Sequence, residues 1–178
     1  MYKRQAAAVA AAERGGNDGI AAGRDFSRGR RSFHAARCIV CHRFGDAGGA
    51  TGPDLTQAAG RFGLRDLAEA IVEPSKAVSD QYRASIVLTA DGRAVTGRII
   101  GESAQTITVV TDPEQPTTFV EIARSDVEEL VPAAESPMPG GLLDTLGESE
   151  VLDLLAYVLS RNNPRDQRFT PSSPAQRP

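Results

Sequence analysis

A Cys-x-x-Cys-His pattern constrains this chain more than any other feature of its sequence. Cys38 and Cys41 are the only two cysteines among the 178 residues, and His42 follows the second of them directly. On a helical turn the two thiols lie on one face, about as far apart as the two vinyl groups of a porphyrin, and the adjacent histidine can reach the iron. The pattern therefore predicts one covalently bound haem c, attached through Cys38 and Cys41, with His42 as an axial ligand.

Two other uses of a Cys-x-x-Cys pair rank below haem attachment. A thioredoxin-type redox pair follows a strand in a βαβ unit, whereas this pair ends a predicted helix. A structural zinc site needs four ligands. Only His34 could join the three residues of the motif, and the four ligands would then crowd within the short segment 34–42. Zinc binding and thiol redox chemistry are therefore the minor alternatives.

Composition and charge exclude several other classes of protein. Hydrophobic residues make up 40% of the chain, and the net charge of −3 argues against nucleic acid as a partner. No apolar stretch approaches the roughly 18–20 residues that a membrane helix needs, so we expect no integral membrane segment. The charge is nevertheless polarised, because segment 24–65 holds eight arginines against three acids and segment 101–160 holds twelve acids against one base. A basic and an acidic region are expected to result.

Hydrophobic periodicity predicts helices near both ends of the folded part and strands between them. Three segments have helical spacing: about 25–37, then 64–72, which Pro74 ends, and a last helix that starts at Glu148 or Ser149. Between them lie short segments rich in Val, Ile and Thr, separated by turn signals such as Asp91-Gly92. These strands are expected at 84–89, 94–100, 106–110 and 117–122, and a single turn from Ser125 leads into a fifth that ends near Val131.

The strand segments predict a compact β-module of about fifty residues, curled into a small SH3-like antiparallel barrel. Because it lies between helical parts, we interpret it as an insertion into an all-α domain. Both ends of the chain lack a periodic apolar face. The expected order is a disordered linker or truncated N-terminus (1–23), a part with Cys-x-x-Cys-His (24–82), the β-module (83–132), a part with Met138 and the last helix (133–161), and a disordered tail (162–178).

The residues around the motif resemble the class I c-type cytochromes. The resemblance covers residues 25–72 and 135–160 and leaves the β-module outside it. Gly29-x-x-x-Phe33 is similar to the first-helix motif that packs on the last helix, which here carries Tyr157. The resemblance implies a mainly α cytochrome c fold, with three helices around the haem and the inserted β-module, and therefore an α+β chain overall.

The resemblance also implies further residues of the haem pocket. Gly52-Pro53-Asp54-Leu55 is similar to the loop beneath the haem, in which the carbonyl of the proline accepts a hydrogen bond from the axial histidine. Leu55 would then pack on the porphyrin. We expect a dry pocket, formed by Leu55, Leu64, Leu67, Leu142, Leu143 and Leu155.

Met138 is the expected sixth ligand of the iron. It lies between Pro137 and Pro139 on an irregular segment that resembles the distal methionine loop, and the only other methionine is the first residue. A lone methionine is often core filler, but a packing methionine more naturally lies on a helix or strand. His34 is the competing ligand. It lies one turn from Cys38 on the same predicted helix, so it cannot easily reach the opposite haem face.

Two departures from the family point to a subfamily. Phe33 lies five residues before Cys38, one more than in mitochondrial-type cytochromes, and the β-module replaces a short helix or loop. Both features resemble the C-terminal haem-binding domains of planctomycete-type secreted dehydrogenases. A non-enzymatic electron-transfer domain is implied, which is periplasmic or otherwise extracytoplasmic. Its electrons would pass from a fused or partner dehydrogenase to an acceptor such as a cytochrome or oxidase.

Two other functions stand beside electron transfer. In a gas-binding or sensor haem domain, Met138 would be displaceable. In an interaction module, the β-barrel would bind a partner and the haem would be structural. The β-module itself has three alternative roles: a docking surface, a dimer interface, or a lid over one edge of the haem.

Overall fold

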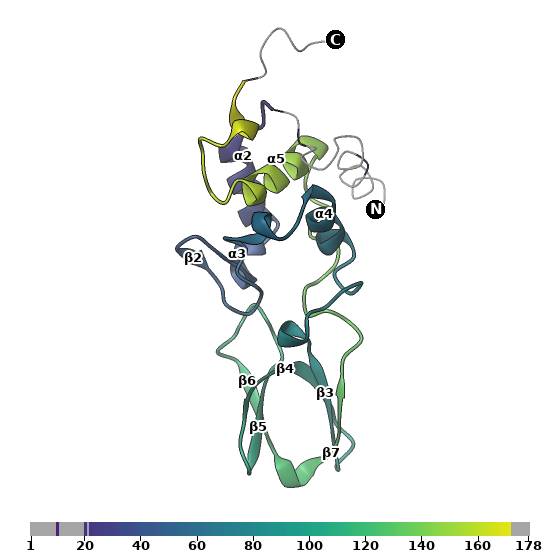
Figure 1. The fold of residues 1–178 in the computed structure, drawn as a ribbon. Coiled ribbons are helices and arrows are strands. Elements are labelled where there is room, and N and C mark those ends of the chain that lie inside the picture. The colour runs from purple at the N-terminus through teal and green to yellow at the C-terminus, as the bar shows by residue number, and fades with distance from the viewer. Residues whose placement is uncertain (1–9, 11–19, 21, 172–178) are drawn as a thin grey trace. The chain divides into compact units, whose positions relative to one another are not determined.

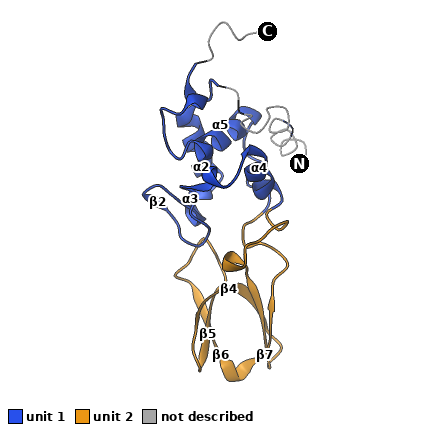
Figure 2. Ribbon diagram, in the orientation of Figure 1, with its two compact units in different colours: residues 1–73, 140–178 blue, residues 74–139 orange. Residues whose placement is uncertain are grey.

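The computed structural model describes residue 10, residue 20 and residues 22–171 of the chain (Figure 1). The chain divides into two compact units, one formed by residues 1–73 and 140–178 and the other by residues 74–139 (Figure 2). Most of the expected linker 1–23 lies outside the described residues, as does the end of the expected tail, 172–178. No helix in the described part is long and apolar enough to cross a membrane.

Helices α2 (Phe26–Ala35) and α3 (Cys38–Cys41) open the first unit. The Asp25 side chain caps α2, because its Oδ1 accepts a hydrogen bond from the Arg28 backbone N–H at 2.8 Å. Arg37 separates the two helices with a left-handed φ of 60°. Such a residue cannot continue a right-handed helix, so the two cysteines lie on a short turn of their own.

Helices α4 (Leu64–Val72) and α5 (Glu148–Leu159) complete the helical part of the first unit. Each begins with a carboxylate that caps a backbone N–H: Asp66 Oδ2 accepts from Gly63 at 2.9 Å, and Glu150 Oε2 accepts from Gly147 at 2.7 Å. Helix α5 is buried from Val151 to Leu159 apart from partly exposed Leu152, and it forms the centre of the unit.

Helices α2 and α5 touch at Gly29, as the resemblance of Gly29-x-x-x-Phe33 implies. A Cβ on Gly29 would lie 2.2 Å from the Asp153 carbonyl oxygen and 2.8 Å from Tyr157 Cβ. Around this crossing the Tyr157 ring packs against the rings of Phe26, Phe33 and Phe44 at centroid distances of 5.2, 5.7 and 5.0 Å. Only glycine allows the two backbones to approach this closely.

Asp153 is a fully buried carboxylate on α5 beneath the start of α2. Its Oδ1 accepts a hydrogen bond from the Asp25 backbone N–H at 3.2 Å and lies 3.7 Å from Arg24 Nε. Its Oδ2 accepts a short hydrogen bond from Arg28 Nε. The carboxylate thus ties the first residues of α2 to the middle of α5 and has partners for both oxygens, as a buried charge requires.

The described part of the expected tail is ordered rather than disordered. A 3-10 helix spans Gln167–Phe169, and the Phe169 ring packs edge-on against Phe26 at 5.2 Å. The Arg24 backbone N–H also donates to the Arg168 carbonyl at 2.9 Å. The prediction from composition differs here because a single aromatic residue, Phe169, is enough to anchor this polar segment on the core.

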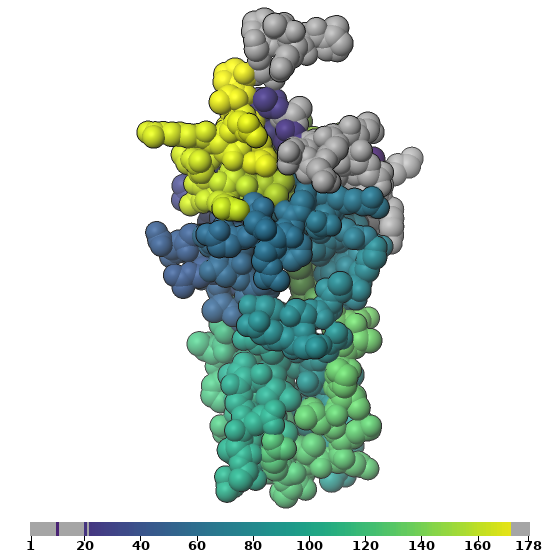
Figure 3. Space-filling model, in the orientation of Figure 1, coloured from purple at the N-terminus to yellow at the C-terminus, as the bar shows by residue number. Residues whose placement is uncertain are grey.

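The second unit is a five-stranded antiparallel sheet with the strand order β6-β5-β4-β3-β7. A 3-10 helix, Arg124–Asp126, precedes the last strand. The core consists of Val87, Ile107, Val109 and Ile122, and side chains fill the oval gap that the ribbon leaves between the strands (Figure 3). The strands are β3 (Ser85–Thr89), β4 (Ala94–Glu102), β5 (Thr106–Val110), β6 (Phe119–Ala123) and β7 (Val127–Pro132).

The second unit is wider than the expected module 83–132. It also contains the 3-10 helix Asp80–Tyr82 and the segment that carries Met138. Ser136 closes this unit near its two ends, because its backbone N–H donates to Ser75 Oγ at 3.0 Å. These flanking segments have no strand periodicity, so the sequence pattern did not include them.

Candidate haem-binding site

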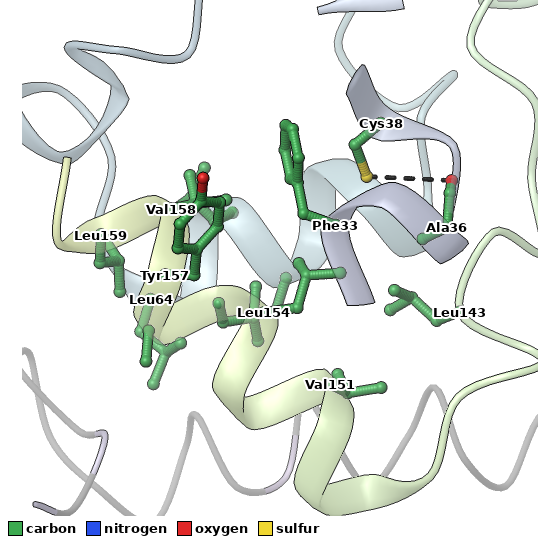
Figure 4. Close-up of a cluster of buried hydrophobic side chains, with 14 of the residues drawn as sticks. Phe33, Ala36, Cys38, Leu64, Leu143, Val151, Leu154, Tyr157, Val158 and Leu159 are labelled. Atoms are coloured by element: carbon green, nitrogen blue, oxygen red, sulfur yellow. Dashed lines mark hydrogen bonds between the residues drawn. The ribbon is translucent and has the colours of Figure 1, made fainter. Parts of the chain in front are cut away.

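The two cysteines lie on the single turn α3, and neither forms a disulfide. Cys38 is buried beside Phe33 and Ala36, with its Sγ directed at the Ala36 carbonyl oxygen 3.9 Å away (Figure 4). Burial raises the pKa of the Cys38 thiol to about 12. Cys41 is partly exposed. The pair therefore consists of two cysteines on one turn, neither of them in a disulfide.

His42 leaves the turn in an extended conformation, with φ −103° and ψ 133°, and its ring is buried. Its Nδ1 lies 2.7 Å from the Pro53 carbonyl oxygen. Since a carbonyl can only accept, Nδ1 carries the proton and Nε2 keeps its lone pair. Burial lowers the pKa of His42 and outweighs the opposing effect of the Pro53 hydrogen bond. The ring is thus held as a neutral imidazole with Nε2 available for a metal.

The glycine-rich loop after the motif closes against His42. The hairpin β1 (Arg43–Phe44) and β2 (Ala47–Gly48) begins it, and the Gly52 backbone N–H donates to the Cys41 carbonyl at 2.8 Å. A Cβ on Gly52 would lie 2.8 Å from His42 Cε1 and 2.9 Å from His42 Nδ1. The ring lies flush against this backbone, and only glycine at position 52 leaves room for it.

The leucines of the expected dry pocket all belong to the first unit. Four are buried in the hydrophobic core that also contains Cys38, while Leu55 and Leu142 are partly buried. The buried four are Leu64, Leu67, Leu143 and Leu155. Two thiols, a neutral imidazole fixed at Nδ1 and an apolar surround are the groups that a covalently bound haem requires, so the residues present fit the cofactor.

The two candidates for the sixth ligand differ in their surroundings. Met138 is partly buried, and its backbone N–H donates to Ser136 Oγ at 3.1 Å. It belongs to the second unit, whereas Cys38, Cys41, His42 and Pro53 belong to the first. His34 is exposed on the last turn of α2. Across the described part of the chain, no group of three or more His, Cys, Asp or Glu side chains is placed to hold a metal ion.

One residue that shapes the site received no role from the sequence, and another was missed. Gly52 lies in the loop Gly52-Pro53-Asp54-Leu55 named above, but only the structure shows that it controls the approach of this loop to the His42 ring. Asp153 fixes the start of α2, the helix that leads to the motif, and no local signal marks it.

One family model matches part of the chain. The family model Cytochrome c matches residues 26–96, which contain the motif, the Pro53 loop and α4 and extend into β4. No curated protein matches the chain. The match supports a c-type cytochrome domain. Such domains are electron-transfer haem modules that bind haem c covalently, typically one per domain, so the cofactor is haem c. They work with redox partners and are usually extracytoplasmic.

Proposed function

We propose that this chain is a monohaem c-type cytochrome domain that passes single electrons between a dehydrogenase and a downstream acceptor. The observation that carries the proposal is the buried His42 ring, whose Nδ1 donates to the Pro53 carbonyl directly after a turn that holds both cysteines. Bound haem c supplies the one-electron chemistry of its iron. The dehydrogenase is fused or a separate partner, and the acceptor is a cytochrome or an oxidase.

The role of the proximal residues is to hold one ligand in one orientation. Cys38 and Cys41 supply the covalent links, and His42 supplies Nε2. The Pro53 carbonyl prevents rotation of the imidazole and increases its basicity. Gly52 supports this arrangement, because its backbone lies in van der Waals contact with the ring. A ligand fixed in this way has little freedom to reorganise when the charge on the iron changes.

We further propose Met138 as the sixth ligand. Pro137 and Pro139 restrict the backbone on both sides of it, which lowers the entropy lost in presenting the thioether. The hydrogen bond from the Met138 backbone N–H to Ser136 Oγ also orders this segment. A neutral sulfur ligand favours ferrous iron and raises the potential. His34, the alternative, is exposed on a helix that already carries the motif at its end.

The second unit is proposed to be an SH3-like barrel inserted into the cytochrome fold. Its strand order and the 3-10 helix before the last strand support this assignment. Residues 83–132 contain no histidine, methionine or cysteine, so this segment offers none of the usual axial ligands. A docking surface for the redox partner, in the periplasm or another extracytoplasmic space, is the role that we propose for it.

The experiment that tests the proposed function is production of the chain in a host with c-type haem maturation. Haem should remain on the polypeptide after acid–acetone extraction, and the reduced protein should show a low-spin spectrum. Cys38→Ser is the matched variant, since it removes one of the two links. An intact mass without haem would refute covalent attachment. Rapid binding of carbon monoxide to the reduced protein would favour a gas sensor over electron transfer.

A further inference from the structure

The first unit contains a pocket of about 260 Å³, which shares Leu64 with the expected leucine pocket of the haem but contains none of the residues proposed to attach or ligate it. Its walls are the loop 59–63 with the first residue of α4, the end of α5 at Leu159, and the Arg168 side chain. None of these residues belongs to the Cys-x-x-Cys-His turn or to the Pro53 loop. A pocket of this size admits a molecule of only a few carbon atoms.

Two arginines line this pocket, a third lies beside the lining residue Gly60, and one carboxylate binds one of the two. Arg61 and Arg168 line it, and Arg161 Nη2 lies 3.0 Å from the position that a Cβ on Gly60 would take. Asp166 binds Arg168, whose Nη1 donates to both Asp166 oxygens at 2.9 Å. Among residues 22–171, no carboxylate forms an ion pair with Arg61 or Arg161. The pocket therefore has a surplus of positive charge.

Arg168 also has a buried donor without an acceptor. Its Nε is shielded from water and has no hydrogen-bond partner within the described part of the chain. A buried donor that stays unpaired is unfavourable. The same side chain lines the pocket. Because Nε itself is shielded, an oxyanion bound there would meet the terminal nitrogens of this guanidinium, which carry the charge that Asp166 shares.

The rest of the wall combines the backbone of the loop with apolar side chains. Leu64 and Leu159 are buried, and the Phe62 ring is 42% exposed with the Arg61 guanidinium 5.5 Å from its centroid. Guanidinium groups favour carboxylates and phosphates, which accept paired hydrogen bonds from them. A ligand with an oxyanion head and a short carbon chain would match both parts of the wall.

We propose that this pocket binds a small organic anion, with its carboxylate or phosphate held by Arg61, Arg161 and Arg168 and its carbon chain against Phe62 and Leu159. The site lies outside the haem-attachment residues and does not depend on their function. Whether the head group is a carboxylate or a phosphate ester is decided by two probes, succinate and glycerol 3-phosphate.

The test is isothermal titration of the haem-loaded full chain with each probe at constant ionic strength. We expect saturable binding with one site per chain for at least one probe, and the probe that binds identifies the head group. The proposal is wrong if neither probe reaches saturation with a dissociation constant below about 10 mM. Binding of both probes with equal affinity to several sites would also refute it, since that describes general attraction to a basic surface.

Three variants locate the binding. Arg168→Gln should weaken it about tenfold, because a charged hydrogen bond is lost. Arg165→Gln is the matched control, since Arg165 is exposed and does not line the pocket, and it should stay within about twofold. Arg61→Gln removes the other arginine that lines the pocket, so binding should again weaken. Equal losses in Arg168→Gln and Arg165→Gln, or full affinity in Arg61→Gln, would overturn the proposal.

Discussion

Replacement of Gly29 by alanine sets two opposing effects against each other. Alanine is favoured over glycine inside a helix by about 1 kcal/mol. In α2, however, the added Cβ would meet the Asp153 carbonyl oxygen at 2.2 Å and Tyr157 Cβ at 2.8 Å. Carbon contacts are comfortable only near 3.5 Å, so the helices must separate by about 1 Å. A backbone carbonyl cannot rotate away as a side-chain end can, so we expect the unfavourable contact to dominate.

The magnitude follows from the two contributions. Overpacking of a close-packed core costs about 1–3 kcal/mol, and contact with a rigid backbone belongs at the upper end of that range. After subtraction of the helix preference of alanine, Gly29→Ala should destabilise the first unit by about 2 kcal/mol. For a chain of this length that loss corresponds to a melting temperature lower by about 4–8 °C.

Helical circular dichroism of the haem-loaded protein measures this loss, because the long helices all belong to the first unit. Gly140→Ala is the matched control. Gly140 is a loop residue with nothing within 4 Å of its Cβ position, so this substitution should be neutral or slightly stabilising. If Gly29→Ala melts at or above the wild-type temperature, the close contact of α2 with α5 does not limit packing and the reasoning is wrong.

Four further substitutions, at three positions, have defined outcomes. Met138→Ala should open the iron to cyanide and carbon monoxide, which visible spectra detect. Met138→His should keep the haem attached but lower the reduction potential, which redox titration measures. Unchanged spectra and an unchanged potential in both variants would exclude Met138 as the ligand. Asp153→Ala should lower the free energy of unfolding, measured in urea, by about 2–3 kcal/mol. This loss is smaller than for a fully buried ion pair, because both arginine partners of Asp153 are partly exposed to water. The Thr89 hydroxyl and then Arg93 lower the pKa of Asp91 from 3.8 to about 2. Stability of the second unit should therefore hold above pH 4 and fall between pH 4 and 2, and Asp91→Asn should remove this part of the decline, measured as loss of sheet signal.

Much of the local structure could be predicted, because its causes lie within a few residues. Helix α4 has the expected bounds 64–72, since its apolar stripe starts after a glycine and stops before Pro74. Strand β5 also has the expected bounds, 106–110, and the turn at Asp91-Gly92 joins β3 to β4. Gly92 has a φ of 84° there, which glycine adopts without strain. Hydrophobic periodicity and turn residues act over a few neighbouring positions, so a single sequence is enough to predict the elements that depend on them.

Features that depend on distant contacts could not be predicted. The segments on either side of the strands belong to the second unit through contacts such as the hydrogen bond between Ser136 and Ser75, which are 61 residues apart. Phe169 anchors a polar segment on Phe26. On α5, Asp153 stands within the apolar run 151–159, and nothing nearby in sequence shows that the N–H of Asp25 meets it. Each of these depends on which segments the fold brings together.

In the candidate site, too, the local features could be predicted from the sequence, and the long-range ones could not be predicted from it alone. Cys38, Cys41 and His42 follow from one motif, because covalent chemistry fixes their spacing along the chain. The contact between His42 and Pro53 spans 11 residues and came only from the family resemblance. Gly52 is the physical reason that this contact can form, because any side chain there would occupy the space of the ring. A neutral imidazole directed by a backbone carbonyl is therefore a property of the loop as much as of the histidine. Substitution of Gly52 should consequently disturb His42, the proposed iron ligand, without altering any residue that we propose to bind the haem.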